Sequence, residues 1–283
     1  MGLLENKVAV ITGSSRGLGF AIAETYAEQG AAVVLAARTT KAVDEAVAQL
    51  RARGFRASGV ACDVGNLAQV EALAEHAVQT FGQIDIWVNN AGVSGAYGPT
   101  AHLSNDSVDR VIRTNITGLY YGSVTALRHM LPRKTGKLIN LLGRGESGPV
   151  KFQNAYASSK SWVRSFTLAL AQEYADSGVG IYAFNPGLVD TDMLHQLEAV
   201  EGYEKKLNPL RTVMRFWANP PEVPAQKALW LASSATDGKT GLRVNVLGMP
   251  QMVGGLLRDF SRRLTGKAAP NTDLNITILP PAL

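Results

Sequence analysis

The chain has 283 residues and a net charge of +5; 46% of the residues are hydrophobic and 18% are charged. This composition is too apolar for a disordered protein, and no apolar run reaches the roughly 20 residues of a membrane span. A single cysteine, Cys62, excludes an internal disulfide framework and a cysteine-based zinc site.

Short apolar runs alternate with longer amphipathic segments, beginning with an expected strand at Val8–Thr12 and an expected helix at Gly17–Gln29. Further strands are expected at Ala32–Ala36, Gly59–Cys62, Ile84–Asn89, Lys137–Leu142, Gly180–Phe184 and Arg243–Val246. Further helices are expected at Lys41–Arg53, Leu67–Phe81, Ser107–Leu131, Ala155–Ala175 and Val223–Ala232. Strands that are apolar throughout are typical of a parallel sheet covered on both faces. The alternation predicts an α/β fold, a Rossmann-type doubly wound parallel sheet with helices on both faces.

A glycine-rich turn, Thr12–Gly19, joins the first expected strand to the first expected helix. Its glycines permit a tight turn and let the backbone approach a pyrophosphate closely. The N–H groups at the start of the following helix favour an anion. A tight βα turn without a ligand is the alternative, but the position in the chain favours a nucleotide site.

The spacing Gly-x-x-x-Gly-x-Gly resembles that of the short-chain dehydrogenase/reductase family, and further motifs follow in the family's order from about Lys7 to Val246. These motifs are Cys62-Asp63-Val64, Asn89-Asn90-Ala91-Gly92, Asn115, Tyr156-Ala157-Ser158-Ser159-Lys160, Asn185-Pro186-Gly187 with Thr191, and Lys239-Thr240-Gly241. The resemblance implies a nicotinamide cofactor. Its expected contacts are Gly13, Ser15, Arg16, Gly17, Leu18, Gly19, Arg38, Asp63, Val64, Asn89, Ala91, Gly92, Tyr156, Lys160, Pro186, Gly187, Val189 and Thr191. No metal ligands are expected.

The end of the second strand indicates which cofactor is bound. An NAD site has an acidic residue there, which accepts a hydrogen bond from the ribose 2′-hydroxyl. This chain has Ala37 at that point, followed by Arg38, and Arg16 lies in the glycine-rich turn. Two arginines without a competing carboxylate suit a 2′-phosphate. NADP(H) is therefore the expected cofactor; the alternative is that Arg38 is an ordinary surface arginine.

Tyr156 and Lys160 lie four residues apart and share one face of a helix. A neighbouring ammonium favours the phenolate, so Lys160 is expected to lower the tyrosine pKa. The pair could then transfer a proton to or from a carbonyl or alcohol oxygen. The resemblance implies that Lys160 also holds the nicotinamide ribose and that Asn115 anchors a water linked to Lys160. The expected catalytic residues are Tyr156, Lys160 and Asn115.

The family's catalytic serine, on the strand end before this tyrosine, is replaced by Gly143, and Leu142 beside it offers no hydroxyl. Losing such a donor costs about 2.7–4 kcal/mol in oxyanion sites. The candidates to replace it are Ser147, Arg144, the backbone N–H of Gly143 or Gly145, and Asn154. Because glycine also removes bulk, a larger substrate could fill the gap.

The resemblance and the residues together predict one Rossmann-fold catalytic domain over residues 1–250, with a substrate loop at 188–221. A C-terminal extension at 251–283 is expected to pack on this domain or on a neighbouring subunit. It contains a predicted amphipathic helix at Val253–Leu264 and an extended segment at Asn271–Leu283.

The predicted function is an NADP(H)-dependent oxidoreductase that acts on a carbonyl or alcohol group of a small molecule. The expected pocket walls point to a bulky or aromatic substrate; they hold Tyr97, His102, Phe152, Met193, His195, Tyr203, Met214, Phe216 and Trp217. A dinucleotide-binding scaffold with little or no turnover is the alternative. Basic residues cluster only at Arg258–Lys267, so no nucleic acid is expected, nor is a membrane. A cytoplasmic homodimer or homotetramer is expected.

Overall fold

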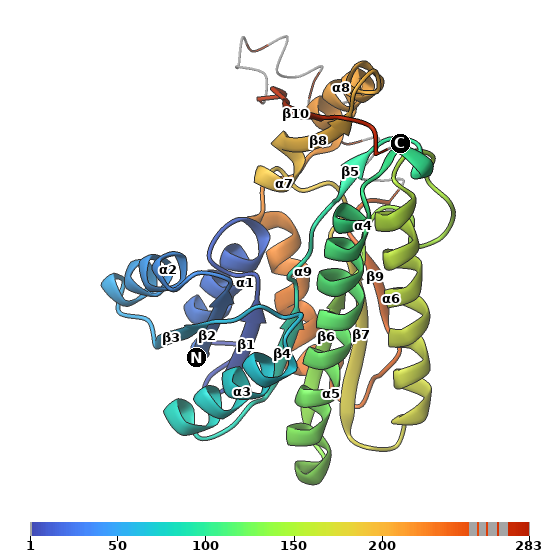
Figure 1. The fold of residues 1–283 in the computed structure, drawn as a ribbon. Coiled ribbons are helices and arrows are strands. Elements are labelled where there is room, and N and C mark those ends of the chain that lie inside the picture. The colour runs from blue at the N-terminus through green and yellow to red at the C-terminus, as the bar shows by residue number, and fades with distance from the viewer. Residues whose placement is uncertain (1, 249–253, 255–258, 260–264, 266–270, 283) are drawn as a thin grey trace.

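Seven parallel strands form the central sheet of the chain, in the order β3-β2-β1-β4-β6-β7-β9 (Figure 1). The structure is a computed structural model that describes residues 2–248, 254, 259, 265 and 271–282. The strands are β1 Val8–Thr12, β2 Ala32–Ala37, β3 Ala57–Ala61, β4 Ile86–Asn89, β6 Gly136–Leu141, β7 Val179–Asn185 and β9 Arg243–Asn245. The predicted doubly wound parallel sheet is confirmed.

Helices cover both faces because alternate residues of a strand point to opposite sides of the sheet. In β1, Ala9 and Ile11 pack with α1 (Gly17–Glu28), α2 (Thr40–Ala52) and α9 (Glu222–Ala232). Val10, between them, packs in a separate core with α3 (Leu67–Phe81), α5 (Leu119–Met130) and α6 (Asn154–Glu173). Burial on both faces explains why the strands are apolar throughout.

The helix expected at Ser107–Leu131 is divided into four shorter elements. α4 (Asn105–Val111) runs into a π-helical turn, η2 (Ile112–Gly118), which leads into α5 and a short 3-10 turn, η3 (Leu131–Arg133). Single π-helical turns inside α-helices occur frequently at functional sites. Here the turn carries Asn115, which is 1% exposed.

A small second sheet of three parallel strands lies with α8 at the top of the molecule in Figure 1, in the order β10-β8-β5. The elements of this region are β5 Ala96–Tyr97, η1 Thr100–His102, α7 Asp192–His195, β8 Gln196–Val200, η4 Glu204–Leu207, α8 Asn208–Trp217 and β10 Asn275–Leu279. Loop 188–221 is therefore folded, and the C-terminal strand β10 pairs with it. The predicted helix Val253–Leu264 lies outside the described residues, apart from Gly254 and Asp259.

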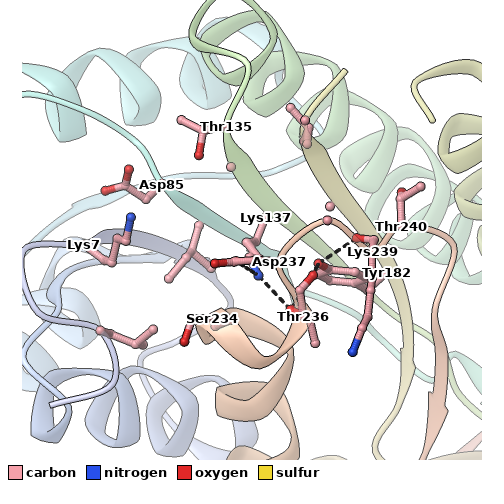
Figure 2. A pocket seen from close by; sticks show the side chains of 18 of the residues that line it. Lys7, Asp85, Thr135, Lys137, Tyr182, Ser234, Thr236, Asp237, Lys239 and Thr240 are labelled. Atoms are coloured by element: carbon pink, nitrogen blue, oxygen red, sulfur yellow. Dashed lines mark hydrogen bonds and ion pairs between the residues drawn. The ribbon is translucent and has the colours of Figure 1, made fainter. Parts of the chain in front are cut away.

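The order of strands reverses between β1 and β4, so a crevice is expected where the carboxyl ends of these two strands diverge. A cavity of about 330 Å³ lies at the opposite end of the sheet, beside the amino ends of β6 and β7 (Figure 2). There Lys137 Nζ donates to Ser233 O and Thr236 Oγ1 and pairs with Asp237. These bonds tie Lys137 of β6 to the segment around η5 (Ser234–Thr236), which connects α9 to β9. The ammonium group of Lys137 is thus bonded within the chain.

Candidate active site

The glycine-rich turn has no room for side chains on the side that faces β4. Gly13 has a φ of +64°, and a Cβ on it would lie 2.8 Å from Ala91 Cα. A Cβ on Gly19 would overlap Gly13 O and the side chain of Asn90. In the described structure no side chain caps the start of α1, whose N-cap residue is Arg16. The bare backbone and the uncapped helix start fit a dinucleotide pyrophosphate.

Three polar side chains that the sequence analysis did not single out hold this turn in place. Asn90 Nδ2 donates to Thr12 O and Gly13 O, both at 2.9 Å. Thr12 Oγ1 accepts from the backbone N–H groups of Asn90 and Ala91. Ser14 is fully buried and links the turn to β2, donating to Ile11 O and accepting from Ala36 N. The position of Asn90 beside Asn89 in the same motif was the available sequence signal.

The two predicted phosphate-binding arginines differ in their surroundings. Arg38 is exposed directly after β2, next to the half-buried Ala37. Arg16 Nη1 lies 2.9 Å from the carboxylate of Asp192, in loop 188–221. The expectation that no carboxylate competes for these arginines was therefore wrong for Arg16, because loop 188–221 folds back onto the turn.

The predicted contacts after β3 and β4 are divided between the crevice and the core. Asp63 accepts from Gly65 N at 2.9 Å and is half-exposed, whereas Val64 packs on Gly118. Asn89 is turned away from the crevice: its side chain bonds Trp87 Nε1, Ser123 Oγ and Asn140 Oδ1 in a buried network. This residue fixes β4 against β6 and α5, while its neighbour Asn90 holds the turn.

The predicted catalytic residues converge near the carboxyl end of β6. Lys160, 6% exposed, donates from Nζ to Leu141 O at 3.1 Å, and its Nζ lies 5.7 Å from the centre of the Tyr156 ring. A Cβ on Gly92 would lie 3.4 Å from Asn115 Oδ1 and 3.9 Å from Lys160 Nζ. The structure therefore brings Tyr156, Lys160, Asn115 and Gly92 together.

Asn115 spans the site from the π-helical turn. Its Oδ1 accepts from Val93 N, and its Nδ2 donates to Val93 O and to Ser159 Oγ. These bonds connect the segment after β4 to α6, the helix that carries Tyr156 and Lys160. The two backbone bonds to Val93 leave the side chain in one orientation.

Burial determines the protonation of the Tyr156–Lys160 pair. It raises the pKa of Tyr156 to about 12 and lowers the pKa of Lys160 to about 8. The pKa of Tyr156 is thus shifted upward, not downward as expected, because burial desolvates the phenolate.

Gly143 lies directly against the hydroxyl of Tyr156. A Cβ at position 143 would overlap Tyr156 Oη and lie 3.3 Å from Cζ and 3.4 Å from Lys160 Cε. The space beside Gly143 that was expected to receive a substrate is thus occupied by the tyrosine itself. Glycine at this position lets the hydroxyl approach the backbone of the loop after β6.

The four expected replacements for the missing serine differ in their availability. Ser147 Oγ accepts from Arg243 Nη2 at 3.0 Å. Asn154 bonds Thr100 and Ser158. Arg144 is exposed, and its positive charge acts to lower the pKa of Tyr97, although burial raises that pKa overall. The fourth candidate is the backbone N–H of Gly143 or Gly145; Gly145 has a φ of +93° and packs on Ala157.

Glu146 is a site residue that the sequence analysis missed. Its side chain is 5% exposed and lies between two arginines: Oε1 accepts from Arg243 at 2.8 Å, and Oε2 lies 3.6 Å from Arg164 Nε. Asn185 Nδ2 also reaches Oε1, at 3.5 Å. The loop after β6 is thereby tied to α6, β7 and β9. A lone acid in a glycine-containing loop gives no sequence signal for this role.

The loop after β7 lies over the glycine-rich turn. Gly187 has a φ of +74°, its N–H donates to Asn185 Oδ1, and Pro186 precedes it. Val189 forms a bridge with Asn219. A Cβ at Gly17 would lie 3.2 Å from Thr191 Cγ2, so Thr191 reaches the start of α1. Of the predicted residues of this loop, Thr191 therefore lies beside the glycine-rich turn.

Four of the predicted wall residues form an aromatic cluster. Phe152 contacts Tyr97 and Tyr203 edge-on, with ring centres 5.5 and 5.2 Å apart, and His102 packs edge-on against Tyr203. Phe152 has a φ of +66°, which is a strained conformation for a bulky residue. Its backbone O accepts from Gly98 N, which helps to hold that conformation. Of the other predicted wall residues, Met214 is buried, Met193 is exposed, and Phe216 contacts Trp217.

No group of three or more His, Cys, Asp or Glu side chains in the described part of the chain is placed to hold a metal ion. No helix within the described residues combines the length and the apolar character needed to cross a membrane.

The chain is similar to several proteins of known type. It is 36% identical over 247 residues to 3beta-hydroxysteroid dehydrogenase 1 of Eggerthella lenta, covering 87% of this chain and 94% of that protein. Over the same length it is 32% identical to glucose 1-dehydrogenase 2 of Bacillus subtilis, covering 87% of this chain and 95% of that protein.

Solved structures give the same result. The fold matches a variant of actinorhodin polyketide ketoreductase with NADPH, at a TM-score of 0.77 and 29% identity over 86% of this chain and 96% of that one. It also matches a gluconate 5-dehydrogenase from Burkholderia cenocepacia in complex with NADP and tartrate, at a TM-score of 0.77 and 27% identity over 89% and 96%. The short chain dehydrogenase family model matches residues 7–202. This chain therefore belongs to the short chain dehydrogenase family, and is an oxidoreductase acting on alcohol or ketone groups.

Proposed function

We propose that this chain is an NADP(H)-dependent ketoreductase or alcohol dehydrogenase in which Tyr156 passes the proton and Gly143 stands in place of the catalytic serine. One arrangement carries the proposal: the buried Tyr156–Lys160 pair lies beside the carboxyl end of β6, close to Gly92 and Asn115. The bare glycine-rich turn, where a cofactor pyrophosphate fits, follows β1, which is separated from β6 in the sheet by β4.

Tyr156 acts as the acid in the reductive direction. A hydroxyl with a pKa of about 12 keeps its proton at neutral pH and can donate it to a carbonyl oxygen. Lys160, with a pKa of about 8, is charged at neutral pH and stabilises the phenolate that remains. Asn115 holds the segment after β4 against α6. When bound, a nicotinamide cofactor supplies or accepts the hydride.

Arg38 supports the choice of NADP(H). It is exposed at the end of β2, where a 2′-phosphate would lie in this fold, and no acid precedes it at Ala37. Arg16 can contribute only if its bond to Asp192 is shared or broken. The related ketoreductase and gluconate 5-dehydrogenase structures contain NADPH and NADP, respectively.

We favour Arg144 as the replacement for the serine donor because its side chain is exposed, whereas the Ser147 hydroxyl is turned toward Arg243 and the Asn154 amide toward Thr100 and Ser158. The guanidinium follows Gly143 directly and can donate two bonds to a polar or anionic substrate.

The cluster of Tyr97, Phe152 and Tyr203 favours a bulky or aromatic substrate. Two relatives are named for a hydroxysteroid and for a polyketide.

A second copy of the chain is the proposed protein partner, in a homodimer or homotetramer. The α5 and α6 helices present aromatic side chains: Tyr120 is 44% exposed and contacts Phe166, which stacks on Trp162 at 4.7 Å. We propose a cytoplasmic protein without a nucleic-acid or membrane partner.

Arg38→Asp tests the cofactor assignment. The added carboxylate would repel a 2′-phosphate and accept a bond from the NAD ribose, so NADPH affinity should fall about 100-fold or more while NADH affinity is unchanged or rises. Binding is measured by quenching of protein fluorescence with each cofactor, and Arg128→Asp, at an exposed arginine of α5, is the control. Equal affinity of the wild type for NADPH and NADH would refute the assignment.

Cofactor binding without turnover of a broad ketone and quinone panel would favour the scaffold alternative.

A further inference from the structure

The side chain of His195 bridges loop 188–221 and the C-terminal segment, residues 271–282. Its Nε2 lies 2.5 Å from Asp190 Oδ1, and its Nδ1 lies 2.7 Å from the backbone oxygen of Asp273. A carboxylate and a backbone carbonyl are both acceptors, so each ring nitrogen must donate. A neutral imidazole carries only one N–H, so both contacts are hydrogen bonds only in the imidazolium form.

The charged groups around His195 favour this form. The bonds to Asp273 O and to the Asp190 carboxylate raise the pKa of His195, the carboxylates of Asp190 and Asp192 add to the effect, and partial burial opposes it. Two cations also lie in this region. Arg16 pairs with Asp192, and Arg211 of α8 lies 3.7 Å from the Asp273 carboxylate and 3.4 Å from Thr272 O.

His195 sits where several connections meet. Asp190 N donates to Asn219 O, and the next residue, Thr191, contacts the start of α1 at Gly17. On the other side, β10 follows Asp273 and pairs with β8 along its whole length. Arg215 of α8 also holds Asp259, through bonds of 2.7 and 3.2 Å. The C-terminal segment is therefore attached to the loop that covers the glycine-rich turn.

We propose that His195 is a positioning residue whose imidazolium form fixes the C-terminal segment onto loop 188–221 and so holds Asp190–Asp192 over the cofactor turn. A raised pKa in the folded state means that the attachment is complete below the unfolded histidine value of about 6.5. It is lost as the pH rises through the higher folded value. Above that value one of the two bonds breaks and the bridge is lost, while the pairing of β10, the contacts of Arg211 and the bond from Ala282 N to His102 O remain.

The protonation of His195 is tested by NMR of the full chain labelled with ¹⁵N in its four histidines. The ring nitrogens of His195 should keep the imidazolium shifts to a pH above the ordinary histidine value of about 6.5. Asp190→Asn removes the negative charge and should lower the His195 pKa. A His195 that titrates at the ordinary histidine value, or is unaffected by Asp190→Asn, overturns the protonated bridge.

The positioning role is tested by hydrogen exchange, with NADPH present and absent. In His195→Gln the β10 amides should exchange about tenfold faster or more, as expected for loss of a charge-assisted hydrogen bond. The amides of β1 report global stability and should be unchanged, as should all amides in the control His129→Gln. In the wild type the ratio of β10 to β1 protection should fall with rising pH, and in His195→Gln it should not. Unchanged β10 protection in His195→Gln overturns the proposal, whether or not the chain turns over a substrate.

Discussion

The hydroxyl of Tyr156 occupies the space that a side chain at position 143 would need. Two functional positions are therefore coupled: position 143, in the loop after β6, determines how far the tyrosine can move toward that loop. Any side chain at position 143 must displace Tyr156 Oη and would also contact Tyr156 Cζ closely, at 3.3 Å, whereas Lys160 Cε lies at 3.4 Å.

Gly143→Ala should therefore reduce activity although it adds only a methyl group. Overpacking of this kind typically lowers the free energy of unfolding by about 1–3 kcal/mol. Part of the strain can be relieved by a shift of Tyr156, which would lower turnover instead of stability. Thermal unfolding and turnover measured together separate the two effects. Gly143→Ser should share the loss and regain part of the turnover only if its hydroxyl bonds the substrate oxygen. Full activity of Gly143→Ala would show that the tyrosine position is not set by this contact.

Tyr156→Phe removes the proposed acid without altering the packing of the ring. Turnover should fall by about 10²–10⁴-fold, the range for general acid–base catalysis, while NADPH affinity is retained because the turn and Arg38 are elsewhere. In the wild type, the rate of reduction should decline as the pH rises through about 8, where Lys160 loses its charge, and not before. Stopped-flow measurement of NADPH oxidation from pH 6 to pH 9 checks both expectations. A fully active Tyr156→Phe enzyme would refute the assigned role.

At the scale of elements, loop 188–221 is a folded unit rather than an open connection. β8 lies between β5 and β10, and the apolar side chains of Leu197, Ala199 and Ile276 form a small core with Tyr97 and Leu207. This core joins the segment after β4 to the C-terminal segment, so one of the predicted substrate walls depends on residues near the end of the chain.

Truncation after Met249 should expose this small core. Loss of β10, and of the pairs that Asp259 and Asp273 make with α8, should increase hydrogen exchange in β8 and α8 and raise the substrate KM. The central sheet should be unaffected, because its seven strands lie before residue 249. A truncated enzyme with wild-type KM and unchanged exchange in β8 would show that the C-terminal segment does not support the loop.

At the scale of the whole molecule, the aromatic surface of α5 and α6 predicts self-association. Tyr120→Arg, at a residue that is 44% exposed, should convert the expected dimer or tetramer to a smaller species in light scattering. Trp230→Arg on α9, on the other face of the sheet, changes a side chain of similar exposure (40%) and should leave the mass unchanged. A monomeric wild type would refute the assembly, and an unchanged Tyr120→Arg would refute this surface.

The strands, most helices and the glycine-rich turn could be predicted from the sequence because each depends on local information. Buried parallel strands are apolar throughout, as Val8–Thr12 is, and a backbone that must approach another chain segment needs glycine, as at Gly13. The division of the long helix at Asn115 was missed, since a π-helical turn depends on contacts to Val93 and Ser159 rather than on periodicity.

The sequence by itself determined the α/β class, the nucleotide turn, the Tyr156–Lys160 pair and the absence of a hydroxyl at Gly143. Only the tertiary structure decided what surrounds these residues. Asp192 reaches Arg16, Tyr156 fills the space at Gly143, burial reverses the expected pKa shift of the tyrosine, and Glu146 and His195 join distant segments. The physical reason is that patterns along a chain report local geometry and burial. Pairing of charges and desolvation depend on which residues meet in space.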